Sequence, residues 1–299
     1  MDSQRWEQPH VLYGQDHILK VNKPKSRPDL IKEAKLASYL NERELPFKFS
    51  EPVEIHPQGY FAVFKRLDDR HLTPKRLNAY SPAQMNGFAR SIGTFLSFLH
   101  AHIFPSNILA LVPRNSRDLV LRWVGRAITY IQEYTEIRTA DCEARVDHLT
   151  DSLDQRYAVT HRDFTFGNIL IGPGESEKPS IIDFAESEVC DPSLDFAYFA
   201  EDVEDEGIRH EPIMEAMFEN YQTSDTQIRK KAEFKRLERE IIRTFRKIRR
   251  SVRRGPPVPL GLSRIVSLLT CLIAQIDLPD FTKHDTADLN LSSDDGKER

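Results

Sequence analysis

The sequence predicts an α+β protein with two lobes, a small β-rich lobe followed by a larger, mainly helical lobe. Short β-like runs, separated by turn residues, fill the first 67 residues. A polar stretch at residues 68–74 follows, and beyond it apolar residues recur mainly at helical spacing. A chain of 299 residues is long enough to bury a substantial core.

The expected elements of the small lobe are four strands and one helix. A hairpin is predicted from the two runs on either side of Gly14-Gln15-Asp16. A helix is predicted where Ile31, Ala34, Ala37 and Leu40 repeat at helical spacing, and two more strands surround the turn Pro57-Gln58-Gly59. The expected ranges are strands 11–13, 17–21, 47–55 and 60–67, and helix 28–41.

The second lobe is predicted to be mainly helical, with two short strands at residues 168–171 and 180–182. Its best-marked helix begins at Ser81-Pro82 and carries an apolar stripe to His100. Further helices are expected at residues 119–137, 212–221, 225–253 and 262–276. The resulting organisation is a lobe at 1–67, a hinge at 68–74, a helical lobe at 75–281 and a disordered tail at 282–299.

Composition excludes several classes of protein. The chain has 42 Lys and Arg against 46 Asp and Glu, a net charge of −4, so no global field for a polyanion is predicted. Three widely spaced cysteines, without a Cys-x-x-Cys pair, support neither a zinc site nor a disulfide scaffold. The N-terminus is polar, and the longest nearly apolar run, 265–276, is too short for a membrane helix. We therefore expect a cytoplasmic protein without a membrane span.

The segment 159–199 carries the chemistry. Asp163 follows His161-Arg162, Asn168 comes five residues later, and Asp183 comes fifteen residues after that. Alone, each such residue is usually a turn former. Together they flank two short strands, and a hairpin brings them into one pocket. Phosphoryl transfer needs such a set, in which one carboxylate orients the attacking hydroxyl while an amide oxygen and a second carboxylate hold Mg²⁺.

This segment resembles the aminoglycoside phosphotransferase/choline-kinase superfamily, closest to its 2″-aminoglycoside phosphotransferase group. The matching motifs are His161/Asp163/Asn168, Ile181-Ile182-Asp183-Phe184 and Asp191-Pro192/Asp195. The resemblance implies a protein-kinase-like fold and a small-molecule kinase that moves a nucleotide γ-phosphoryl group to a hydroxyl. Asp163 would be the catalytic base, Asn168 and Asp183 the Mg²⁺ ligands, and ATP the donor, with GTP possible. Asp195 is expected to cap a helix or to brace a loop.

The resemblance also makes the first lobe nucleotide-binding. Lys20 looks like the strand lysine that holds the nucleotide phosphates, and Glu33 looks like its helix partner. The lobe is shortened, because only about ten residues precede Val11 and Gly14 is the only glycine near the hairpin. A glycine-rich loop that covers phosphates is therefore expected to be weak or absent.

Two charged stretches compete to define the acceptor side. Residues 201–206 hold five acids and resemble the stretch with which the 2″ group binds substrate ammonium groups, which makes Glu201 and Glu204 the candidate substrate-binding residues. Residues 229–254 hold thirteen Lys and Arg and three acids. The basic stretch is expected to be a solvated helix face. Its alternative partners are a phosphorylated metabolite, a membrane surface or nucleic acid, with nucleic acid the less favoured.

The predicted partners are therefore a nucleotide and a small molecule that carries hydroxyl and amine groups. Two alternative functions stay open at this point. One is a nucleotide-binding pseudokinase or scaffold, suggested by the missing phosphate-covering loop. The other is a kinase for an anionic metabolite or a protein, although no Ala-Pro-Glu motif follows Asp183 as it does in protein kinases.

Overall fold

The computed structural model describes residues 10–22, 27–114, 157–172 and 179–222, and all of 227–243 except 234, 238, 241 and 242. The helices predicted at 119–137 and 262–276, and the tail at 282–299, lie outside the described residues. Of the helix predicted at 225–253, the described residues between 228 and 243 are helical.

The described part of the first lobe forms an antiparallel sheet of four strands in the order β1-β2-β5-β4. The predicted hairpin is confirmed, because β1 and β2 pair on either side of residues 14–16. Lys20 lies in β2 opposite Ala62 of β5, so neighbours flank it on both sides. The strands are β1 (His10–Tyr13), β2 (His17–Val21), β4 (Pro52–Ile55) and β5 (Phe61–Lys65).

Helix α1 (Arg27–Asn41) is buried on more faces than its apolar stripe predicts. It contacts β4 and β5 of the sheet and also β3 (Lys48–Phe49) and the 3₁₀ turn η3 (Phe184–Glu186). Glu33, which lies off the predicted stripe, is only 2% exposed. Such a carboxylate is tolerated only when it is paired or protonated, so the burial of α1 already points to a partner for Glu33.

A second described sheet, in the order β3-β9-β8-β6, joins segments from both lobes. The single strand expected at 47–55 is wrong: β3 ends at Phe49 and pairs in parallel with β9, while β4 begins at Pro52 and pairs with β5. The chain therefore changes sheet at Ser50 and Glu51. The polar stretch at 68–74 also contains a strand. The remaining strands are β6 (Arg70–His71), β8 (Ile169–Ile171) and β9 (Ser180–Ile181).

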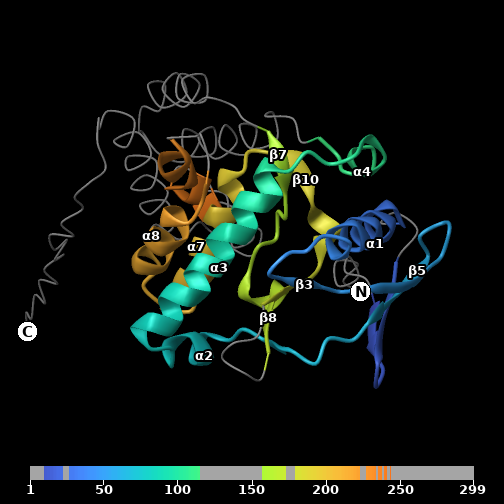
Figure 1. Cartoon of the computed structure of the whole chain (residues 1–299), viewed down its shortest axis with the longest axis horizontal. Coiled ribbons are helices and arrows are strands. Elements are labelled where there is room, and N and C mark those ends of the chain that lie inside the picture. The colour runs from blue at the N-terminus through green and yellow to red at the C-terminus, as the bar shows by residue number, and fades with distance from the viewer. Residues whose placement is uncertain are drawn as a thin grey trace, which may run out of the picture.

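The second lobe is organised around helix α3 (Pro82–Ala101), which crosses the centre of Figure 1. Its start matches the prediction, because Ser81 and Gln84 form a reciprocal capping box. At Gly93 a Cβ atom would come within 2.3 Å of the Met217 carbonyl oxygen, so only glycine lets α8 approach α3 this closely. The other helices are α2 (Pro74–Asn78), α4 (Ser106–Leu109), α7 (Ser193–Asp205) and α8 (Glu211–Glu219).

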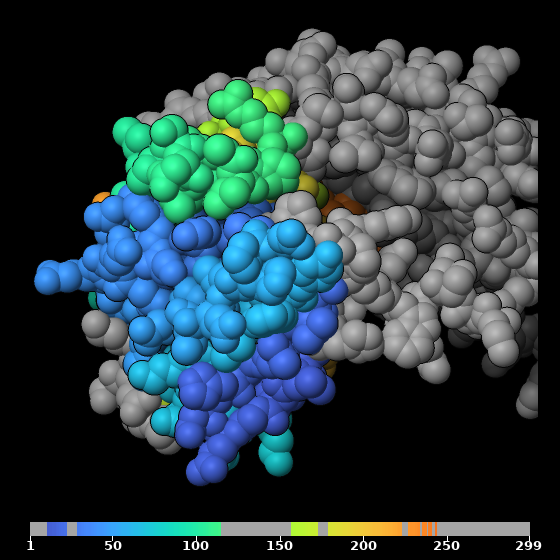
Figure 2. All heavy atoms as spheres, turned by 90° about the vertical axis from the view of Figure 1, so that its right-hand side faces the viewer, coloured from blue at the N-terminus to red at the C-terminus, as the bar shows by residue number. Residues whose placement is uncertain are grey.

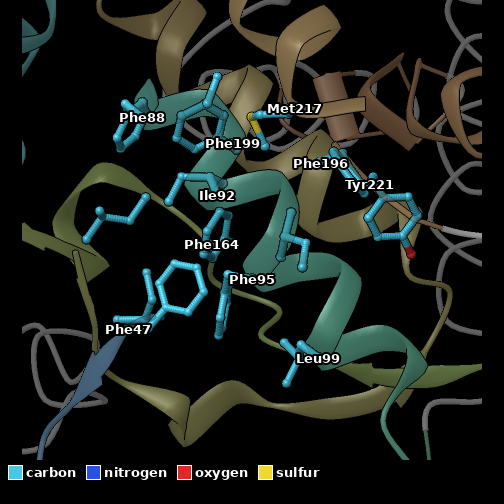
Figure 3. Packing of buried hydrophobic residues seen from close by; sticks show 14 of the residues in the cluster. Phe47, Phe88, Ile92, Phe95, Leu99, Phe164, Phe196, Phe199, Met217 and Tyr221 are labelled. Carbon is cyan, nitrogen blue, oxygen red and sulfur yellow. The ribbon is translucent and has the colours of Figure 1, made fainter. Parts of the chain in front are cut away.

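The main core forms where α3 meets α7, α8 and the loop around Asp163 (Figure 3). Phe95 of α3 stacks on Phe164 with ring centroids 5.9 Å apart, and Phe164 contacts Phe199 of α7 at the same separation. Phe164, the residue after Asp163, is fully buried. The loop around Asp163 is therefore fixed to the core through Phe164.

Together these elements confirm the predicted α+β, two-lobed architecture; the exact domain boundaries stay predictions. In Figure 2 the blue and cyan atoms of the first lobe form one continuous body, and the green segment that follows α3 lies against it. Contacts between α1 and α4, and between the rings of Tyr39 and Phe104, tie that segment to the lobe. No helix among the described residues has the length and apolar content that crossing a membrane requires.

Candidate active site

The loop that carries Asp163 begins where β7 (Ala158–Thr160) ends. Arg162 adopts a left-handed backbone with φ 70°, which a residue with a side chain rarely occupies without support. The support comes from Asp195, whose carboxylate accepts the backbone N–H groups of His161 and Arg162, each at 2.8 Å. Asp195 therefore braces this loop, which was one of its two expected roles.

The brace extends into the core through His100. The Nε2 atom of His100 lies 3.0 Å from Asp195, and its Nδ1 lies 2.9 Å from the Tyr221 hydroxyl. Burial alone would raise the pKa of Asp195, but the hydrogen bond and charge of His100 and the amide of His161 outweigh it and hold the pKa below its usual value. The carboxylate form, which accepts both loop amides, is thereby stabilised.

Asn168 orients Asp163. Its amide nitrogen donates to the Asp163 carboxylate at 2.9 Å and to the Asp163 carbonyl at 2.7 Å. Since the nitrogen side of the amide is used, the Oδ1 atom of Asn168 is the side that suits a cation. The two residues sit at either end of a short turn that ends with η2 (Phe166–Asn168), so the spacing of five residues places them in contact.

Asp183 follows β9 and also has a left-handed backbone, with φ 64°. The Ile182 carbonyl beside it lies 2.9 Å from the His161 Nε2 atom, and the Ile182 N–H donates to the Asn168 carbonyl. The loop with Asp163 and the end of β9 are therefore held together, and the side chain of Asp183, 41% exposed, is fixed beside Asn168 in the same cleft.

Lys20, Glu33 and Asp183 come together from three separate elements. The Lys20 Nζ atom lies 2.7 Å from Glu33 Oε1 and 3.0 Å from Asp183 Oδ1. Burial raises the pKa of Glu33 to about 7, against the opposing effect of Lys20. For Lys20 burial lowers the pKa, but the charges of Glu33 and Asp183 outweigh it, and the net shift is upward. The lysine is therefore held as a cation facing the cleft.

The cleft lies between the first lobe and the second sheet and has a volume of about 590 Å³. Four of the predicted site residues line it, namely Lys20, Glu33, Asn168 and Asp183. Apolar side chains line it as well, among them Ile18, Phe64, Leu170 and Ile182. This mixture of charged groups and apolar walls suits a flat ring carrying an anionic chain.

The hairpin turn at Gly14 is fixed at one edge of this cleft. Arg66, just beyond β5, donates from its backbone N–H to the Asp16 carbonyl at 2.8 Å, and from its guanidinium to the Gly14 carbonyl at 3.0 Å. Gly14 therefore lies in a hairpin turn that Arg66 holds in place, and not in a free loop over Lys20.

A cation in this cleft would meet oxygen donors. The described residues contain no group of three or more His, Cys, Asp or Glu arranged to enclose a metal. Mg²⁺ does not need such a group, because it is usually held by one or two protein oxygens together with phosphates and water. The Asp183 carboxylate and the Asn168 amide oxygen fit that mode of binding.

The acidic stretch lies on α7, against the loop that carries Asp163. Asp202 accepts the Phe166 N–H at 2.7 Å, which fixes α7 to this loop. Glu201 pairs with Arg239 at 2.5 Å, and Glu204 pairs with Arg236 at 2.8 Å. Both predicted substrate-binding carboxylates therefore already have arginine partners from the basic stretch.

Several residues of the site lay outside the sequence-based prediction. His100, where the apolar stripe of its helix ends, has its ring buried against Asp195. Asp202 was one acid among five, without a role of its own. Lys32, 4% exposed, donates to the Ser187 carbonyl at 3.0 Å and ties α1 to the segment after Asp183. A polar side chain shows no local sequence signal of its role when its partner is distant in the chain, as all three partners are.

The two-lobed fold, with a lysine–glutamate pair facing an Asp, Asn and Asp set, defines a kinase-like phosphotransferase. The model of the phosphotransferase enzyme family matches residues 3–261, most of the chain. The chain belongs to this family, which confirms the predicted family and its activity as a small-molecule kinase acting on a hydroxyl group.

Solved structures support the same fold. The streptomycin–ATP ternary complex of APH(2″)-IIa is 18% identical, with a TM-score of 0.58, and the match covers 90% of this chain and 93% of that one. A GDP and kanamycin complex of another APH(2″) enzyme is 17% identical, with a TM-score of 0.58 and 89% and 90% covered. A choline/ethanolamine kinase family protein from Mesorhizobium loti is 13% identical, with a TM-score of 0.56 and 91% and 86% covered.

Proposed function

We propose that the cleft binds a nucleoside triphosphate and that Asp163 directs a small-molecule hydroxyl onto its γ-phosphoryl group. The main support is that Lys20 contacts both Glu33 and Asp183, in the same cleft as Asn168. A lysine held between two carboxylates is a fixed point charge, which suits a phosphate chain. Glu33 positions Lys20, and Lys20 binds the phosphates.

Asp163 is the proposed catalytic base. Asn168 holds its carboxylate in place, so the acceptor hydroxyl meets an oriented oxygen that takes its proton as the oxygen–phosphorus bond forms and the bond to the leaving diphosphate breaks. Asn168 and Asp183 are the proposed Mg²⁺ ligands. The bound ion would neutralise phosphate charge.

The nucleotide donor is proposed to be ATP, with GTP as the alternative. Support comes from the similar structures, of which one binds ATP and another GDP. The apolar walls of the cleft, from Ile18 and Leu170, suit either base. The small-molecule acceptor binds on the side of Asp163 that faces α7, where Asp202 and Arg162 join the loop to that helix.

We also propose a cytoplasmic location. Cys190 is a free, buried thiol, and burial raises its pKa to about 12, which leaves it unreactive.

Nucleic acid is not a proposed partner, because the arginines at 236, 239 and 243 are engaged with acids of this chain. A pseudokinase is not favoured, since Asp163, Asn168 and Asp183 are all present and connected.

The test is phosphate transfer by purified wild-type protein and Asp163→Asn, with Mg²⁺, labelled nucleotide and a panel of hydroxyl compounds. The amide cannot accept the hydroxyl proton, so turnover should fall about 10²- to 10⁴-fold. Nucleotide affinity should stay within about twofold, because Asp163 does not line the nucleotide cleft. Equal turnover by the two proteins would remove Asp163 from the mechanism.

A further inference from the structure

The acidic edge of α7, defined here as Glu201, Glu204 and Asp205, is paired with arginines of the basic stretch. These are three of the five acids at residues 201–206. Two arginines contact Glu201, since Arg239 lies 2.5 Å away and Arg243 lies 3.3 Å away. Arg243 also pairs with Asp205. Glu201 is 12% exposed, so its carboxylate is largely covered as well as neutralised. Both the charge and the accessible surface of this carboxylate are therefore already used within the chain.

The same arrangement holds one turn away. Arg236 lies 2.8 Å from Glu204 and 2.6 Å from Glu233, and its side chain is 16% exposed. His210 lies 3.0 Å from a Glu204 oxygen. Burial would raise the pKa of Glu204, but His210 and Arg236 outweigh it and keep the pKa below its usual value. Glu204 is therefore a paired carboxylate.

These arginines lie next to the catalytic loop. The Arg239 guanidinium stacks on the Tyr198 ring, 3.2 Å from its centroid. The Arg162 guanidinium, from the residue that precedes Asp163, lies 5.8 Å from the same centroid. Tyr198 thus connects the loop to Arg239, and Arg239 connects it to Glu201. Two positively charged groups flank the ring beside the proposed acceptor position.

A polyamine acceptor binds to a protein surface through unpaired carboxylates, and here it would have to displace three guanidinium groups. Arginine competes well for a carboxylate, because its planar fork forms short, directional hydrogen bonds. Arg239 gains further from the aromatic ring beneath it. An ammonium group of the acceptor would therefore gain little at Glu201, because two guanidinium groups of the chain already bind this carboxylate.

We infer that Arg236, Arg239 and Arg243 determine acceptor specificity by closing the acidic edge of α7 to polycations, so that the acceptor is a hydroxyl compound without a polyammonium charge. The inference rests on the proposed function, since it concerns the acceptor of that same site. Glu201 and Glu204 then hold these arginines in place beside Tyr198, and neither binds an ammonium group of the substrate.

The experiment measures kanamycin binding by calorimetry at low ionic strength to the wild type and to the double variant Arg239→Gln/Arg243→Gln. The double variant frees Glu201 and Asp205, so its kanamycin affinity should rise at least tenfold above that of the wild type. Added salt should reduce the gain. Adding Glu201→Gln to the double variant should abolish the gain, which ties it to that carboxylate.

Two matched controls separate charge from shape and from position. Arg239→Lys/Arg243→Lys keeps both charges and should show no gain. Arg229→Gln removes an arginine of the same basic stretch that pairs with exposed Glu215 at 2.6 Å, and should also show no gain. Should the double variant fail to fold, wild type against Glu201→Gln alone decides, because equally weak kanamycin binding by both is expected.

Tight kanamycin binding by the wild type that Glu201→Gln weakens would overturn the inference, and so would a folded double variant without a gain. Binding of Mg²⁺-nucleotide by the same preparations is measured separately. Absent nucleotide binding would count against the proposed function, whereas normal nucleotide binding with tight kanamycin binding by the wild type would count against the acceptor inference alone.

Discussion

Both ends of the proposed site contain carboxylates paired with cations, yet they differ in what remains for a ligand. On the nucleotide side the Lys20 Nζ atom pairs with two carboxylates, Glu33 at 2.7 Å and Asp183 at 3.0 Å. On the acceptor side Glu201 and Asp205 share two arginines, one of which also stacks on Tyr198. The first cluster has more carboxylates than cations, whereas in the second the two signs balance.

The difference shows how similar pairs are suited to different tasks. In the nucleotide cluster Asp183 is 41% exposed, so one carboxylate oxygen can bind a cation while the lysine faces a phosphate. In the acceptor cluster Asp205 is exposed as well, at 54%, but each carboxylate has an arginine partner, and Arg239 and Glu201 are both mostly covered. The nucleotide cluster is therefore open to ions at Asp183, whereas the acceptor cluster is closed to them at Glu201.

The largest expected effect tests the open cluster. Asp183→Ala removes a proposed Mg²⁺ ligand and one partner of Lys20. Nucleotide at 100 times its Kd stabilises the wild type by about 2.7 kcal/mol, and the variant should lose most of that gain. Thermal unfolding with and without Mg²⁺-nucleotide measures it. Arg243→Gln, in the closed cluster, is the control and should keep the full nucleotide-dependent shift.

A smaller effect concerns proton binding by Glu33. Its pKa of about 7 lies above the usual 4.5, so between these values the folded protein keeps a proton that the unfolded chain releases. Stability from this group is therefore greatest at low pH and falls as pH rises toward 7. Glu33→Gln carries no such proton. Relative to the wild type, its free energy of unfolding should therefore increase by about 1 kcal/mol or more between pH 5 and pH 8.

Denaturant unfolding at several pH values checks this expectation. Glu51→Gln is the matched control, because Glu51 is 65% exposed in its contact with Lys65 and should leave the pH dependence unchanged. Parallel stability curves for the wild type and Glu33→Gln would show that Glu33 is an ordinary carboxylate, and the contrast between the two clusters would then lose its electrostatic basis.

Sequence patterns predicted the elements whose signals are local. The hairpin around Gly14, the capping box that starts α3 and the spacing of Asp163 from Asn168 each depend on residues close together in the chain. The pairing of Lys20 with Glu33 also followed from a family-like spacing of a strand and a helix, and the structure brings the two into contact.

Contacts between distant segments were beyond such patterns. The break between β3 and β4 depends on pairing of Phe49 with Ile181, more than a hundred residues away. The sequence likewise shows two charged stretches of opposite sign, but it does not show that Arg239 meets Glu201. Charge patterns indicate where charges lie along the chain, whereas their partners depend on how the helices pack.

The most direct test of the proposed nucleotide site is the affinity of Mg²⁺-nucleotide for Lys20→Met, measured by calorimetry beside Lys65→Met. Lys65 lies on β5 of the same sheet and is 64% exposed, so it controls for the loss of a charge in this lobe. We predict at least a tenfold loss of affinity for Lys20→Met, about 1.4 kcal/mol, and less than a twofold change for Lys65→Met. Equal affinity of Lys20→Met and the wild type would contradict the proposal that this cleft holds the nucleotide phosphates.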